Sequence, residues 1–441
     1  MTRNSPNEDD VLNEDIKTSK RKINWIYSIL PYSIAVGPVG TFVQLYILLD
    51  LHGSLIVYSL IITLANAIGI PAAIIWGFVA DHYHKRKRII VATYLAVTAN
   101  LIVFLVVGSI AWTAVLYALF AFISAASATP LNLLILETQG KSKWAFAFAR
   151  FSFVSSIGTT VGLAASAVWT DILPLKLLVL PLSILSIASA VLSIFMIKEP
   201  GFIFEGEIIT MEKRSFSQRL LALPLLIQRV PRLADFRSVF LGLRNRLTSQ
   251  IPILYLSIFF FYLASGIFNT SLTPSLTSAK LNSGDVFLIS FVGMMVQTLA
   301  FYFAGPYIER RTLKVTAISG LALRSLCYGL MGVSSLLLTR LAYLGSILVL
   351  YPIAAGIAFA MYYTASNVMI FNTLGPKGRA STLGVYSALV GIATMIGSII
   401  SGLTSFYVGY YATFVLAGLC LACAAFLTSL LAPGAQDQSH L

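Results

Sequence analysis

Long apolar stretches alternate with short polar connections along almost the whole chain. Each stretch holds around 20 apolar residues, the length at which a helix rising 1.5 Å per residue crosses about 30 Å of hydrocarbon. The pattern therefore predicts twelve membrane-spanning helices. The expected spans cover residues 24–49, 55–80, 88–109, 112–137, 146–169, 174–197, 251–276, 284–307, 313–335, 340–370, 380–406 and 409–431.

Composition supports the same interpretation. Hydrophobic residues make up 58% of the chain and charged residues 11%, with a mean hydropathy of +0.86. Soluble proteins carry about 25% charged residues, so a bilayer has to be the main solvent of this chain. We expect an all-α membrane protein.

Basic residues mark one side of the predicted membrane. The formal net charge is +13, which in a soluble protein would suggest nucleic acid. Here Lys and Arg lie between the spans, and 26 of the 30 fall on one side. The positive-inside rule then predicts a multi-pass protein of the cell membrane with both termini cytoplasmic. The lipid bilayer is the expected partner of these charges, and nucleic acid is not.

The spans divide the chain into two similar halves. We expect a polar cytoplasmic tail (1–22) that is not a signal peptide, a six-helix bundle (23–197), a basic central loop (198–250), a second six-helix bundle (251–432) and a short cytoplasmic tail (433–441). The central loop mixes arginines with Leu, Phe and Val, which predicts amphipathic helices on the inner leaflet. A regulatory or partner-docking role for this loop is the alternative.

An internal repeat links the two halves. Glycine, an acid and a base recur after spans two and eight at a spacing of 228, and glycines and alanines recur around spans five and eleven at a spacing of 235. The matched pairs are Gly77/Gly305, Asp81/Glu309, Arg86/Lys314, Gly140/Gly375, Ala145/Ala380 and Gly162/Gly397. Two pseudo-symmetric six-helix bundles follow from this duplication.

The Gly77-x-x-x-Asp81 pattern, followed by a basic run, resembles the signature loop of the major facilitator superfamily. The copy from Gly305 to Glu309 and Arg310, the Gly378-Arg379-Ala380 stretch and the glycine-rich span eleven are similar to that superfamily too. The likeness covers about residues 24–432. This chain departs from the superfamily pattern at His84, where the signature loop usually has a glycine. The resemblance implies the major facilitator fold.

That resemblance implies a gate formed by Gly77, Asp81 and Arg86, with Gly305, Glu309 and Arg310 as its weaker counterpart. Gly77 would let span two approach a neighbouring helix closely. Asp81 would cap a helix or pair with an arginine across the two halves in one state. The plainer alternative is that the basic run serves only as a topology signal.

The resemblance also implies that spans one, four, seven and ten line a central cavity, with two, five, eight and eleven beside them. The candidate lining is mostly aromatic and amide, and each side chain could instead join two helices. The candidates are Tyr32, Gln44, Tyr46, Asn66, Asn132, Glu137, Tyr262, Asn269, Thr270, Gln297, Tyr362, Tyr363, Asn367 and Asn372.

Charges within the spans are few. We expect Glu137 to pair with Arg150 or to titrate, and Arg324 of span nine to find a partner or water and to support the fold rather than bind solute. Glu137 and Asp50 are the two candidate sites for a coupling proton. Gly158-Thr-Thr-Val-Gly162 is a degenerate form of the antiporter glycine motif, in which Leu163 replaces the expected proline.

We therefore predict a secondary carrier, acting as a monomer by alternating access, that moves a small organic solute, with protons as the candidate coupling ion. The sparse charge favours export of lipophilic or drug-like compounds. Uptake of a neutral solute such as a sugar, and a non-transporting sensor, are the alternatives. No nucleotide-binding motif, metal-ligand cluster or buried catalytic group is visible, so we expect neither an enzyme nor a cofactor or metal. Cys420 and Cys423 have no partner cluster in the sequence.

Overall fold

The protein is described here by a computed structural model that covers residues 24–82, 85–138, 144–197, 250–309, 312–337, 339–373 and 379–431. Within these ranges helix is the regular secondary structure, and 12 helices are long and apolar enough to span a membrane. The predicted all-α membrane fold is confirmed. The two predicted tails and the amphipathic helices of the central loop lie outside the described residues.

The first six spans form the N-terminal half. Its elements are η1 (Asn24–Ile29), α2 (Leu30–Val36), α3 (Val39–Leu45), η2 (Tyr46–Asp50), α4 (Leu55–His82), α5 (Arg86–Val106), α6 (Ile110–Thr138), α7 (Trp144–Ile172), η4 (Leu175–Leu178) and α8 (Val179–Met196). Span one comprises η1 to η2, and span six comprises η4 and α8.

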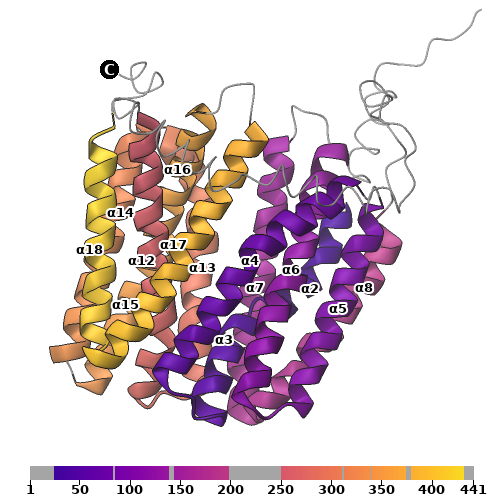
Figure 1. Cartoon of the computed structure of the whole chain (residues 1–441), viewed down its shortest axis with the longest axis horizontal. Coiled ribbons are helices and arrows are strands. Elements are labelled where there is room, and N and C mark those ends of the chain that lie inside the picture. Colours follow the sequence, from indigo (N-terminus) through magenta and orange to yellow (C-terminus); the bar gives the residue numbers. More distant parts are fainter. Residues whose placement is uncertain are drawn as a thin grey trace, which may run out of the picture.

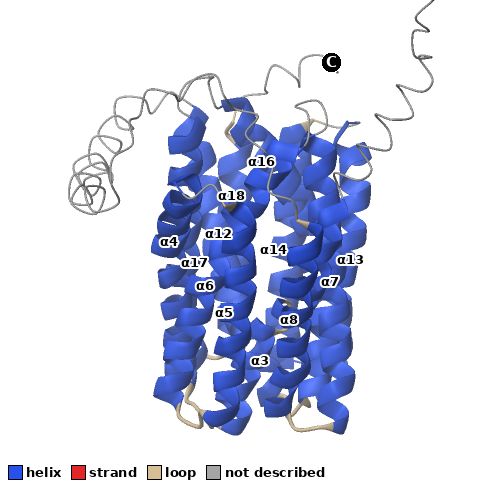
Figure 2. Ribbon diagram, turned by 90° about the vertical axis from the view of Figure 1, so that its right-hand side faces the viewer, coloured by secondary structure: helices blue, strands red, loops and turns tan. Residues whose placement is uncertain are grey.

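The last six spans form the C-terminal half. Its elements are α12 (Gln250–Ser278), α13 (Ser283–Glu309), α14 (Leu313–Leu337), α15 (Arg340–Pro352), η5 (Ile353–Ala358), α16 (Phe359–Thr373), α17 (Arg379–Tyr407) and α18 (Tyr410–Ser429). The two halves lie side by side in Figure 1, and their helices run up and down along one direction in Figure 2. We call the end that holds Asn24 and Ser429 the proximal end and the opposite end the distal end.

Proline interrupts spans one and ten. Pro38 separates α2 from α3, because its ring removes an amide donor from the helix. Pro352 ends α15, and the next six residues form the wide π turn η5 before α16 resumes the α-helix. Such π turns cost hydrogen-bond regularity and often occur near functional sites. Both breaks fall in spans that the resemblance assigns to the cavity.

Glycines set the closest helix contacts, and they do so equivalently in both halves. A Cβ placed on Gly162 of α7 would overlap the carbonyl oxygen of Ile34 in span one. A Cβ on Gly397 of α17 would overlap the carbonyl oxygen of Leu263 in span seven. Small residues permit such approach in membranes. The repeat therefore preserves one packing contact, span five on one and span eleven on seven, and this contact accounts for Gly162 without any appeal to antiport.

Candidate solute pathway between the two halves

Hydroxyl and amide side chains join the halves along spans two, seven and eleven. Asn66 Nδ2 of α4 donates to Ser398 Oγ of α17 at 3.1 Å, and Thr270 Oγ1 of α12 donates to the same oxygen at 3.1 Å. Nearer the distal end, Ser59 of α4 lies so close to Gly402 that a Cβ there would overlap its hydroxyl. One polar network thus fastens α4 to the C-terminal half.

A second seam joins spans five and eight. Ser156 and Thr298 have their hydroxyl oxygens 2.7 Å apart, and Thr160 lies 3.5 Å from the same Thr298 oxygen. At the distal end the Asp171 carboxylate sits against the backbone of Gly284. Close packing here needs glycine, because a side chain would displace the carboxylate.

Spans one and seven complete the contact. Thr273 Oγ1 of α12 donates to Gln44 Oε1 of α3. Within the described residues, every hydrogen bond between the halves lies from the middle of the bundle to its distal end. The structure is therefore a distally closed state, and Gln44 helps to close it.

Asn269 faces the space between the halves. It is exposed, although residues 263–268 and 270–276 around it on α12 are buried. A lipid-facing side chain would belong to an exposed apolar stripe, as on α8, and α12 has none at this level. Its amide makes no hydrogen bond to another described residue and is available to a solute.

Asn132 of α6 lies nearer the proximal end than Asn269. Trp112, Val115 and Leu119 form the lipid-facing stripe of this helix and are 62%, 51% and 43% exposed. At 100° per residue, Asn132 points about 200° away from Trp112. Asn132 is also exposed, so its amide faces the interior of the protein near the proximal end.

An aromatic wall lines the C-terminal half. Phe359 and Tyr363 stack with ring centroids 5.3 Å apart, and Phe301 of α13 lies edge-on to both at 6.2 and 5.9 Å. Tyr363 is 38% exposed. Asn367, one turn further, donates its Nδ2 to the Tyr363 carbonyl at 2.9 Å. We use "aromatic wall" for Phe301, Phe359 and Tyr363.

Behind this wall lies Arg324. It is 3% exposed, and its guanidinium carbon sits 4.9 Å from the Phe261 ring centroid, 5.2 Å from that of Phe359 and 5.2 Å from that of Tyr328. Arg324 Nε donates to Tyr328 OH at 2.9 Å, while Nη1 has no hydrogen-bond partner in the described part of the chain. The partner that a midplane arginine requires is thus a ring cage, and no described carboxylate lies beside it.

Other predicted lining residues are less accessible in this state. Tyr32 is buried and stacks on Tyr94 of α5 at 4.0 Å. Tyr362 is buried against Phe261 at 4.1 Å. Gln297 is half-buried on α13, where its backbone packs against Gly356 of η5. Tyr32 and Tyr362 stabilise helix contacts within a half.

The signature loop is described in part. Arg86 is buried and donates to the carbonyl of Ala80 near the end of α4, which ties the start of span three to span two. A Cβ on Gly77 would meet no described atom within 4 Å. The close helix approach that we expect at Gly77 therefore stays a prediction.

The structure describes less of the other predicted gate residues. Asp81, Gly305 and Glu309 lie on helices, but their side-chain surroundings fall outside the described residues, as does Arg310. The gate itself stays a prediction.

The charged residues that we singled out in the sequence have different surroundings in the structure. The described partner of Arg150 is Tyr27, whose hydroxyl accepts from Nη2 at 2.6 Å and whose ring lies 5.2 Å from the guanidinium carbon. The side chain of Glu137 lies outside the described residues, so its pairing with Arg150 stays a prediction. Asp50 is exposed at the distal end, near Lys176.

Sequence reasoning missed Ser156, Thr298, Thr273 and Ser398. Hydroxyl side chains are frequent in membrane helices and usually bond to their own backbone, so nothing in the sequence distinguishes those that join the halves. The aromatic wall was missed in part for a similar reason, since Phe301 and Phe359 look like ordinary lipid-facing residues.

Two six-helix halves with polar and aromatic surfaces facing the space between them define a membrane transport protein. The chain belongs to the Major Facilitator Superfamily, whose family model matches residues 25–243 and 254–440. The predicted family is confirmed, and the protein is a transporter of small solutes rather than an enzyme. No curated protein sequence matches the chain significantly.

Solved transporters share the fold at low sequence identity. A transporter of the POT family, crystallised with a conjugated peptide, has a TM-score of 0.71 at 12% identity and covers 93% of this chain and 95% of its own. The xylose transporter XylE from E. coli has a TM-score of 0.65 at 10% identity, covering 95% and 98%. The nucleoside transporter NupG has a TM-score of 0.60 at 14% identity, covering 94% and 98%.

Proposed function

We propose that this protein is a secondary carrier of the cell membrane that exports lipophilic, aromatic-bearing compounds by alternating access, with its proximal end in the cytoplasm. The observation that carries the proposal is the aromatic wall, accessible at Tyr363, together with the unpaired amide of Asn269. Stacking on a ring at about 0.5–1.5 kcal/mol per pair suits a flat apolar solute. Amides can orient such a solute through one or two hydrogen bonds.

The charge inventory supports an uncharged or weakly charged cargo. Among the described side chains, Asp50, Asp171 and Asp285 all lie at the distal ends of helices, and none lies at the level of the wall. A site built to attract organic cations would place a carboxylate near its rings. Proton coupling, if the carrier uses it, therefore rests on Glu137 or Asp50.

Binding tests the aromatic site. Purified wild-type protein is titrated with naphthylacetamide and, in parallel, with xylose and uridine, using thermal shift and intrinsic fluorescence. We expect naphthylacetamide to bind and Tyr363→Leu to weaken it between about twofold and tenfold, the size of one aromatic contact. Tyr302→Leu is the matched control, because Tyr302 of the neighbouring α13 is 71% exposed and continues the exposed stripe of Leu288, Met295 and Leu299. Equal losses in both variants would contradict the site.

Cross-linking tests alternating access. With the three native cysteines replaced by serine, Ser156→Cys and Thr298→Cys bring two thiols together on α7 and α13, where the wild-type hydroxyls are 2.7 Å apart. Oxidation should hold the protein distally closed and stop flux into or out of proteoliposomes, and reduction should restore it. Full flux in the oxidised protein would refute a cycle that opens this seam.

Uptake of a neutral solute is the second candidate. It is favoured by the three amides of Asn132, Asn269 and Asn367, which could bind the hydroxyl groups of a sugar or nucleoside. Binding of xylose or uridine in place of naphthylacetamide would decide for it.

A further inference from the structure

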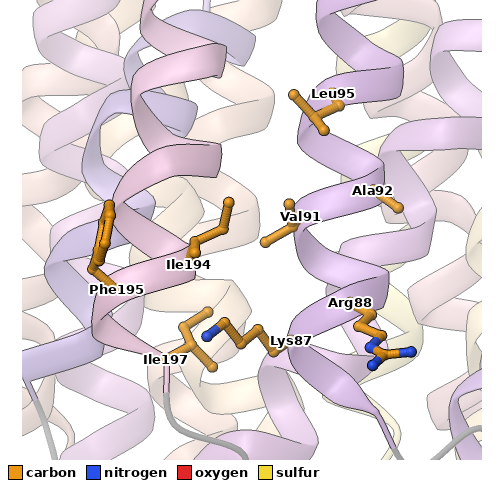
Figure 3. A pocket seen from close by; sticks show the side chains of 8 residues that line it. All are labelled: Lys87, Arg88, Val91, Ala92, Leu95, Ile194, Phe195 and Ile197. Atoms are coloured by element: carbon orange, nitrogen blue, oxygen red, sulfur yellow. The ribbon is translucent and has the colours of Figure 1, made fainter.

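A groove of about 700 Å³ lies on the outer surface of the N-terminal half, between the proximal ends of α5 and α8. Figure 3 shows Lys87 reaching from α5 to a position beside Ile197, with Val91 and Ile194 facing each other one turn deeper. The groove is separate from the space between the halves and from every residue of the proposed solute pathway.

The groove changes from cationic to apolar along one face of α5. Lys87, Val91 and Leu95 are four residues apart and therefore lie on the same side of the helix. The stripe from Lys87 to Leu95 is about 12 Å long at 1.5 Å per residue. Its cationic end lies at the first turn of the span, where a membrane helix meets the headgroup layer, and its apolar end points toward the bilayer centre.

The apolar part opens to lipid. Leu95 is 48% exposed, Ile194 45% and Phe195 77%, and all three belong to membrane-spanning segments. In a bilayer these side chains are covered by acyl chains. The hollow between them is therefore filled by hydrocarbon rather than by water.

The two cations at its mouth have no protein partner among the described residues. Neither the Lys87 ammonium nor the Arg88 guanidinium makes a side-chain hydrogen bond or ion pair with a described residue. By contrast, Arg86 next to them is buried and bonded to Ala80. Adjacent residues of one basic run thus divide between a structural contact and two charges that face the headgroup layer.

We propose that this groove binds one anionic phospholipid, with its phosphate on Lys87 and Arg88 and an acyl chain along Val91 and Leu95. A free anion would use the charges but leave the apolar wall unmatched, whereas a phospholipid matches both. A bound lipid would hold the proximal end of α5. Because Arg86 joins that end to α4, the lipid would also bias the movement of the signature loop.

Native mass spectrometry of the full-length protein in detergent tests the site. The protein is titrated with phosphatidylglycerol and, separately, with phosphatidylcholine of the same acyl chains. Each Lys or Arg near an anionic headgroup contributes about fivefold in affinity. The double variant Lys87→Gln, Arg88→Gln should therefore weaken the binding of phosphatidylglycerol about thirtyfold and leave the binding of phosphatidylcholine unchanged. Lys85→Gln is the matched control, since Lys85 is exposed beside the groove but does not line it.

A variant that fills the groove distinguishes binding of a lipid from binding of a free anion. Ala92 is exposed on α5, so Ala92→Trp can occupy the hollow without disturbing the core. It should reduce binding of both lipids while keeping both charges. The proposal is overturned if Lys85→Gln lowers the affinity for phosphatidylglycerol as much as the double variant does. It is also overturned if millimolar inorganic phosphate displaces phosphatidylglycerol and Ala92→Trp has no effect on lipid binding.

Discussion

Replacing Arg324 by methionine should change how strongly the carrier discriminates between solutes of different charge. The guanidinium group of an arginine is cationic. Its insertion at the middle of a span costs about 2.5–3.5 kcal/mol, and cation–π contacts with its three rings, at about 0.5–2 kcal/mol each, are large enough to offset that. The rings stabilise the charge but do not neutralise it. Its field therefore extends through Phe359 to the exposed face of Tyr363.

The size of the effect follows from the geometry. The guanidinium carbon lies 5.2 Å from the Phe359 ring, which lies 5.3 Å from the Tyr363 ring, so a solute charge at Tyr363 is roughly 10 Å from Arg324. With an effective dielectric constant of about 20, two like charges at that distance repel by about 1.7 kcal/mol. The wild-type protein should bind a cation about fifteenfold more weakly than a neutral compound of the same shape.

Three probes with one ring system measure this ratio: naphthylacetamide, naphthylacetate and naphthylmethylammonium. We expect the ammonium compound to bind weakest and the carboxylate at least as well as the amide. Arg324→Met should bring the three Kd values to within about twofold of one another. Arg324→Lys is the control, because it keeps a positive charge while losing the planar contact with the rings.

If the role of Arg324 is purely structural, Arg324→Met should lower the Tm and weaken the binding of all three probes equally. An unchanged ratio of ammonium to amide affinity in folded Arg324→Met protein would refute the electrostatic reasoning while leaving the aromatic site intact. Failure of naphthylacetamide to bind the wild type would instead refute the proposed function.

Three further changes test other parts of the molecule. Asp81→Asn should leave insertion and Tm intact but slow transport by at least tenfold in proteoliposomes, and normal flux would remove the gating hypothesis. Glu137→Gln should abolish flux driven by a pH gradient and retain solute exchange if Glu137 carries the proton; pH-driven flux that persists would exclude it. Gly397→Ala should destabilise the protein by about 1–3 kcal/mol, because the methyl group would overlap the backbone of α12. Gly69→Ala, whose Cβ would meet no atom of the described residues within 4 Å, should leave the Tm unchanged or raise it.

The sequence by itself determined the number of spans and the division into two halves. Hydrocarbon admits only segments that satisfy their own backbone hydrogen bonds, so an apolar stretch of fixed length is a helix whatever surrounds it. The spacing of the repeat also carried structural information, because Gly162 and Gly397 make equivalent contacts in the two halves.

Which side of each helix faces its neighbours was decided by the tertiary structure. Tyr32 and Tyr363 look alike in sequence, yet one is buried against Tyr94 and the other is exposed on the aromatic wall. Arg324 meets the rings of Phe261 and Phe359, which come from two elements far apart in the chain. Within a membrane the lipid-facing and protein-facing sides of a helix can be equally apolar, so composition does not distinguish them. Only the packing of all twelve helices does.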